Sequence, residues 1–131
     1  MIVIDASAAV DLLLGIEPHA GTIARLIADQ GPLAAPHLLD AEVGQVLRRL
    51  VASRALSLPR AREALDDLAA LPIQRFAHGP LLARAFDLRH NTTVYDALYL
   101  VLAEGLRAPL LTRDRALASI PGHRAKVMVL R

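Results

Sequence analysis

The sequence predicts a three-layer α/β/α sandwich with a central, mostly parallel sheet. Short apolar runs alternate with amphipathic stretches, and the first run, Ile2-Val3-Ile4, shows no polar alternation. A strand of this kind is covered on both faces, as parallel strands joined by helical crossovers are. A chain of 131 residues is long enough to bury one hydrophobic core, so we treat residues 1–131 as a single domain.

Five apolar runs are predicted strands. Residues 2–4 end directly at Asp5, and residues 110–111 lead into a polar turn that holds Asp114. Proline, glycine or charged residues bound the other three runs, which are residues 33–35, 73–76 and 127–130. Sites in open α/β sheets form outside the carboxyl ends of the strands, so Asp5 and Asp114 are both placed to serve one site.

Amphipathic stretches between these runs are predicted helices. Leucine and valine recur at i, i+3 and i+4 spacing around Glu42, which therefore lies on or beside an apolar stripe. Pro59 stands at a first helical position, and Asp96 falls in the first turn of a helix whose entry is polar enough to cap it. The predicted helices cover residues 37–54, 59–70, 91–105 and, briefly, 115–119.

Composition excludes several classes of protein. The hydrophobic fraction of 54% is high, but charged residues interrupt every apolar stretch before the ~18 residues that a membrane-spanning helix needs. The first residues lack the basic and apolar regions of a signal peptide, so we expect a cytoplasmic protein that has no membrane contact. The absence of cysteine excludes disulfides and thiolate chemistry, and a net charge of +2 is a weak argument for a polyanionic partner.

Four acids are the candidate site: Asp5, Glu42, Asp96 and Asp114. Taken singly, three of them have a structural explanation, since Asp5 and Asp114 can begin helices and Asp96 suits a helix N-terminus. Glu42 has none, because a charge among leucines and valines is costly unless it is paired or bound to metal.

Taken together, the four acids would converge on one edge of the predicted sheet. Clustered carboxylates raise one another's pKa, so they stay ionised at neutral pH only beside a cation. Oxygen ligands without cysteine or an adjacent histidine select Mg²⁺, or Mn²⁺, over zinc. Such a site can assist the hydrolysis of a phosphodiester.

Other side chains support narrower expectations. The five histidines show no repeated spacing, and Ser7 lacks the strained elbow of a serine nucleophile. Tyr95 and Tyr99 could stack bases, although we favour core or dimer packing for Tyr99. Arg113 and Arg115 flank Asp114 and are the candidate contacts to substrate phosphates.

Four segments in this order resemble the PIN domains, specifically the VapC toxins of bacterial toxin–antitoxin pairs. They are Met1-Ile2-Val3-Ile4-Asp5-Ala6-Ser7-Ala8, Leu39-Asp40-Ala41-Glu42-Val43, the block from Arg89 to Tyr99 that contains Tyr95-Asp96-Ala97-Leu98-Tyr99, and Leu110-Leu111-Thr112-Arg113-Asp114. The resemblance covers nearly the whole chain. The stretch from Gly15 to Pro36 matches nothing diagnostic, so the target RNA stays open.

The resemblance implies an Mg²⁺-dependent endoribonuclease that leaves 5′-phosphate and 3′-hydroxyl ends. It also implies a homodimer and an antitoxin that occludes the site. Carried over by position, Asp5 and Asp96 are metal ligands, while Glu42 and Asp114 complete the site by direct or water-mediated contact and orient the attacking water. Ser7 and Thr112 match polar positions near the metal, where they would hydrogen-bond the carboxylates.

Four other functions remain open. A phosphoaspartate phosphatase or a receiver domain also places an aspartate after its first strand, but the phosphatase needs a second aspartate where this chain has Ser7. A receiver needs an acidic pair there, whereas Asp5 stands alone. A housekeeping PIN-domain nuclease for RNA processing and a non-catalytic domain that binds RNA or protein are the remaining alternatives.

Overall fold

A computed structural model describes all 131 residues, and its centre is a five-stranded sheet in the order β3-β2-β1-β4-β5. Every neighbouring pair of strands is parallel, which confirms the expected fold class. The strands are β1 (Ile2–Ile4), β2 (Leu33–Pro36), β3 (Ile73–Phe76), β4 (Leu110–Thr112) and β5 (Val127–Val129). Each lies within one or two residues of its predicted position.

The order of the strands creates a switch point beside β1. The chain adds β2 and then β3 on one side of β1, and returns to add β4 and then β5 on the other. Connections therefore leave the carboxyl ends of β1 and β4 in opposite directions and open a crevice between them. Asp5 follows β1 directly and Thr112 is the last residue of β4, so the switch point lies where the sequence predicts the site.

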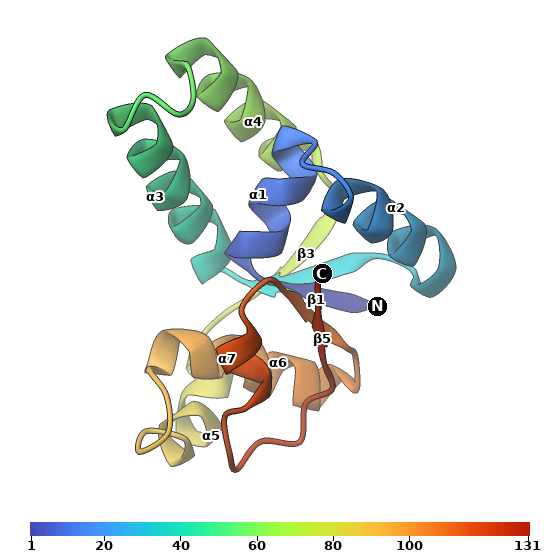
Figure 1. Ribbon diagram of the computed structural model, residues 1–131. Helices are drawn as coiled ribbons and strands as arrows, with labels where there is room; N and C mark the ends of the chain where they lie inside the picture. The colour runs from blue at the N-terminus through green and yellow to red at the C-terminus, as the bar shows by residue number, and fades with distance from the viewer.

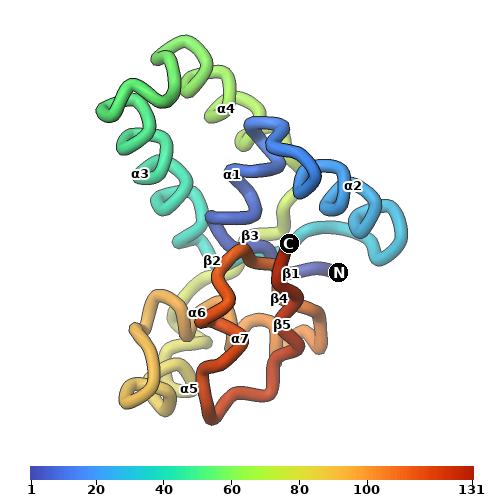
Figure 2. The backbone as a smooth tube through the Cα atoms, in the orientation of Figure 1, coloured from blue at the N-terminus to red at the C-terminus, as the bar shows by residue number.

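Helices cover both faces of the sheet (Figure 1). The first half of the chain, blue to green in Figure 2, supplies α1 to α4 on one face, and the second half supplies α5 to α7 on the other. Their bounds are α1 (Ala6–Leu14), α2 (His19–Gln30), α3 (Leu38–Ala52), α4 (Leu58–Ala70), α5 (Leu82–Asp87), α6 (Val94–Leu106) and α7 (Arg115–Ala118), with a 3₁₀ turn at Gly79–Leu81. No helix is both long and apolar enough to cross a membrane.

Three of the helices were not assigned ranges from the sequence. The α1 helix follows Asp5, which was expected only as a helix-entry residue, and the α2 and α5 helices were not predicted at all. Neither α2 nor α5 has a side-chain cap at its N-terminus, and α5 is only six residues long, so both lack the usual start signals. At α4, Ser57 caps the helix and Pro59 is its second residue rather than its first.

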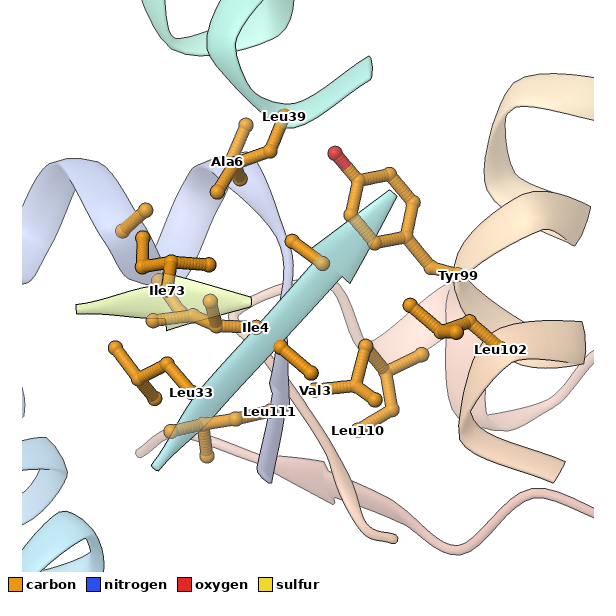
Figure 3. Close-up of a cluster of buried hydrophobic side chains, with 14 of the residues drawn as sticks. Val3, Ile4, Ala6, Leu33, Leu39, Ile73, Tyr99, Leu102, Leu110 and Leu111 are labelled. Atoms are coloured by element: carbon orange, nitrogen blue, oxygen red, sulfur yellow. The ribbon is translucent and has the colours of Figure 1, made fainter. Parts of the chain in front are cut away.

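The core lies on both sides of the central strands. Residues 97–103 of α6 are all buried, and this helix contacts β1, β2 and β4. Figure 3 shows Tyr99 and Leu102 of α6 beside Val3 and Leu110 of the central strands. Because α6 is apolar on almost every side, it packs firmly against the central strands. This packing also fixes the position of Asp96, the acid in its first turn.

Candidate active site

Asp5 is held in place by hydrogen bonds to both of its carboxylate oxygens. It caps α1, where Oδ1 accepts from the Ala8 amide at 3.0 Å, and the Ser7 hydroxyl donates to the same oxygen at 2.7 Å. The Thr112 hydroxyl donates to Oδ2. The hydrogen bonds expected from Ser7 and Thr112 to a carboxylate are therefore present, and they fix this carboxylate in one orientation.

Ser7 and Thr112 also join the two sides of the crevice. Thr112 Oγ1 accepts from the Asp114 amide at 2.9 Å, and Ser7 Oγ accepts from the Arg113 amide at 3.0 Å. The turn after β4 is thus bound to the start of α1 through backbone and side chain together. As a consequence, Asp114 has a defined position relative to Asp5 although it is exposed.

Glu42 has a partner that the sequence analysis did not identify. The hydroxyl of Tyr99, on α6, donates to Glu42 Oε1 at 2.6 Å. Figure 3 shows the Tyr99 hydroxyl pointing toward α3, the helix that carries Glu42. Tyr99 is only 2% exposed, which confirms the expected core packing and adds a polar role. The signal in the sequence is a tyrosine hydroxyl within the apolar stretch 97–103, because a buried hydroxyl needs a hydrogen-bonding partner.

Asp96 and Asp114 differ in the hydrogen bonds that their carboxylates accept. Thr93 caps α6 by accepting from the Asp96 amide at 3.2 Å, while the half-buried carboxylate of Asp96 itself accepts no hydrogen bond from the protein. Asp114 caps α7 by accepting from the Ala116 amide at 2.9 Å. The helix-cap explanation therefore holds for Asp5 and Asp114, and Asp96 is the acid that is free to take a ligand.

The four carboxylates influence one another electrostatically. Burial raises the pKa of Asp5, and the charge of Asp114 adds to the rise, against the hydrogen bonds that stabilise the ionised form. Burial likewise raises the pKa of Asp96, with further contributions from Asp114 and Asp5. For Glu42, burial raises the pKa, the Tyr99 hydrogen bond opposes it, and Asp96 and Asp5 add to it. We call this set, Asp5, Glu42, Asp96 and Asp114, the acidic edge.

The donor set of the acidic edge fits a hard divalent cation. All four side chains offer carboxylate oxygen, and burial together with repulsion from neighbouring carboxylates raises the pKa of Asp5, Glu42 and Asp96, so a cation would stabilise their ionised forms. In this structure no three acids or histidines lie close enough together to enclose one ion. The acidic edge is therefore an electrostatically coupled group of carboxylates and not a closed metal cage.

The two arginines beside Asp114 have different surroundings. Arg113 Nη1 lies 3.1 Å from Oδ1 of Asp11, a buried aspartate of α1 that the sequence analysis did not single out. Arg115 is exposed and forms no ion pair. The signal in the sequence is an acid among the apolar residues of α1, the same signal that marks Glu42, but its partner Arg113 lies 102 positions away and leaves no local pattern.

Comparison with known proteins identifies the family to which this arrangement belongs. The PIN domain family matches residues 2–122. Ribonuclease VapC1 of Mycobacterium tuberculosis is 45% identical over 130 residues, which are 98% of this chain and 97% of that protein. This chain is a PIN domain of the VapC family.

Solved structures agree with that assignment at the level of the fold. PAE2754 from Pyrobaculum aerophilum superposes on this PIN domain with a TM-score of 0.69 and 26% identity, over 96% of this chain and 82% of that one. VapBC2 from Rickettsia felis, solved bound to a DNA fragment from its promoter, gives a TM-score of 0.72 over 100% of both chains. At 15% identity, VapBC2 supports the shared fold alone.

Proposed function

We propose that this PIN domain is a Mg²⁺-dependent endoribonuclease, with Mn²⁺ as an alternative ion, and that it is the toxin of a toxin–antitoxin pair. The observation that supports this proposal is the acidic edge, a set of four electrostatically coupled carboxylates near the switch point of a parallel sheet. The name of the 45% identical relative, Ribonuclease VapC1, supports RNA as the substrate.

Asp5 and Asp96 are the proposed first ligands of the ion. Asp5 is rigid, because Ser7, Thr112 and the Ala8 amide bind it, and Asp96 has no protein donor to displace. Glu42 and Asp114 complete the site, either directly or through water. When bound, the ion lowers the pKa of a water molecule and neutralises charge on the phosphodiester.

The protein side chains then position water and substrate for hydrolysis of the phosphodiester. A water oxygen forms a bond to phosphorus and releases a proton, the bond from phosphorus to the 3′ oxygen breaks, and that oxygen takes up a proton. The products are a 5′-phosphate and a 3′-hydroxyl end. Asp114 and Glu42 accept hydrogen bonds from the attacking water and orient it, since each keeps an oxygen that no protein donor occupies. Thr112 holds Asp5 and the Asp114 backbone together during this step.

An antitoxin is the proposed protein partner, in a cytoplasmic complex that contains a homodimer of this chain. The partner surface that we propose is an apolar groove of about 460 Å³ between α3 and α4. Leu65, which lines it, is 43% exposed, and Arg48 and Arg62 stand at its margin. A partner segment with apolar side chains flanked by acids would cover Leu65 with its apolar side chains. Its acids would pair with Arg48 and Arg62. Two structures that share this fold, VapBC2 from Rickettsia felis and a complex from Klebsiella pneumoniae, were solved as toxin–antitoxin assemblies, and the proposal extends that arrangement to this chain.

The test of this function is a cleavage assay on purified protein with total cellular RNA. We expect cleavage with Mg²⁺, none with excess EDTA, and 5′-phosphate ends that can be ligated and sequenced to map the target. A small reading frame immediately upstream, whose product inhibits the cleavage, favours the toxin over a housekeeping nuclease. Binding of RNA without cleavage at any metal concentration would instead indicate a non-catalytic domain.

A further inference from the structure

Asp11 is a charged side chain that the acidic edge does not use. It is 1% exposed, in the second turn of α1, six residues beyond Asp5. Its Oδ2 lies 2.6 Å from His19 Nδ1, and its Oδ1 lies 3.1 Å from Arg113 Nη1. A carboxylate is buried at this depth only when its partners compensate the charge, so the position of Arg113 is tightly determined.

Arg113 is attached to α1 at two points. Its amide donates to Ser7 Oγ at 3.0 Å, level with the start of the helix, and its guanidinium reaches Asp11. Ser7 and Asp11 are four positions apart on α1, which is about 6 Å along the helix axis. The side chain therefore runs along α1 from the acidic edge, instead of moving freely in solvent.

The same side chain is nevertheless available to a ligand. Arg113 is 52% exposed, and Nη1 alone contacts Asp11, so Nε and Nη2 keep N–H groups that the protein does not occupy. A planar guanidinium fixed along one edge presents its other edge in a defined direction, which suits a phosphate. Arg115, two residues later, has comparable charge but no such anchor.

We propose that Asp11 is a positioning residue that holds Arg113 as a binding site for a backbone phosphate of the RNA, beside the bond that is cleaved. This inference rests on the proposed ribonuclease function and adds to it the residue that orients the substrate strand. Asp11 acts through Arg113 and does not touch RNA. His19 supplies the second hydrogen-bonding partner that keeps the buried carboxylate satisfied.

The test measures RNA binding apart from catalysis. The probe is a fluorescein-labelled short single-stranded RNA of randomised sequence, titrated in EDTA so that it is not cleaved, and KM and kcat are measured separately with Mg²⁺. The variants are Arg113→Gln, Asp11→Asn and the two combined, with Arg115→Gln as the matched control for loss of one charge. The combined variant leaves no unpaired buried charge. It should therefore stay folded even if one of the single variants does not.

We expect Arg113→Gln to raise both Kd and KM about tenfold with little change in kcat, because a charge-assisted contact is lost. The salt dependence of log Kd should become shallower by about 0.7, the value for one phosphate contact on a single strand. Asp11→Asn should shift Kd and KM in the same direction, and adding it to Arg113→Gln should change neither further.

Two results overturn the proposal. One is an equal, small effect of Arg113→Gln and Arg115→Gln, which would reduce Arg113 to general surface charge. The other is an Asp11→Asn protein that loses thermal stability but keeps the wild-type Kd and KM, which would make Asp11 merely structural. Failure of the ribonuclease function looks different, because the wild type would not cleave RNA while the same order of Kd values persisted.

Discussion

The Tyr99 hydroxyl donates a hydrogen bond of 2.6 Å to Glu42 Oε1 and thereby joins α6 to α3 across the acidic edge. This hydrogen bond explains how Glu42 can lie beside an apolar stripe. The buried phenol of Tyr99 satisfies Oε1, and Oε2 is left for a ligand. Burial and the neighbouring carboxylates raise the pKa of Tyr99, so this phenol remains a donor at any physiological pH.

Tyr99→Phe tests the positioning of Glu42. It removes one hydroxyl and keeps the ring that packs in the core, so we expect a loss of about 1 kcal/mol in the free energy of unfolding. We also expect Mn²⁺, titrated by electron paramagnetic resonance, to bind several-fold more weakly. Tyr95→Phe is the matched control, since Tyr95 lies on the same helix and is 62% exposed. Unchanged Mn²⁺ affinity in Tyr99→Phe would show that Glu42 needs no such support.

Asp96→Asn tests the electrostatic cost of the acidic edge. The pKa of Asp96 is raised above its ordinary value of 3.8, so the folded state binds this proton more tightly than the unfolded state does. The resulting penalty is absent below that pH, grows as the pH rises through the folded pKa, and is complete above it. Metal-free Asp96→Asn should therefore be more stable than the wild type at pH 7.

The measurement for this variant is urea denaturation in EDTA at pH 7 and again near pH 4. The stability gain should shrink at the lower pH, because the wild-type carboxyl is then protonated in the folded protein. Asp66→Asn is the control, an exposed residue of α4 remote from the acidic edge. A gain that persists undiminished at low pH would argue against charge as its cause.

Thr112→Val tests the bridge between the two sides of the crevice. Valine fills the buried space of threonine but neither donates to Asp5 nor accepts from the Asp114 amide. We expect a loss of about 1–3 kcal/mol in unfolding free energy, together with weaker Mg²⁺ binding. Calorimetry on this variant and on Thr92→Val, whose hydroxyl makes no such bridge, separates the bridge from the substitution. Equal effects at the two positions would contradict the bridging role.

Leu65→Glu tests the groove between α3 and α4 as the partner surface. A charge placed in the groove should abolish co-purification with the protein encoded upstream, while RNA cleavage stays at the wild-type rate. Leu82→Glu is an equivalent change on α5, where the leucine is also exposed. Retention of the partner by Leu65→Glu, or its loss from both variants, would place the interface elsewhere.

Much of this molecule could be predicted from local sequence, for reasons that particular residues show. Unbroken β-branched and apolar runs identify buried parallel strands, and an acid directly after such a run identifies the carboxyl edge, as at Asp5. The polar entry to the helix that carries Asp96 was likewise predicted, and Thr93 is the residue that caps it.

What could not be predicted depends on contacts between residues far apart in the chain. Glu42 meets Tyr99 over 57 positions, and Arg113 meets Asp11 over 102, so no periodic pattern records either pair. The α2 helix was not predicted because its first residue, His19, is not preceded by a side-chain cap. Here tertiary packing replaces the local signals on which sequence interpretation depends.

The most direct measurement is the rate of RNA cleavage by the purified wild type, Asp5→Asn and Asp96→Asn as Mg²⁺ is raised from excess EDTA to saturation. We predict cleavage that appears only with the ion in the wild type, and a loss of at least about 100-fold in both variants while their circular dichroism is unchanged. Full cleavage by Asp96→Asn, or wild-type cleavage that persists in excess EDTA, would contradict a metal-dependent acidic edge.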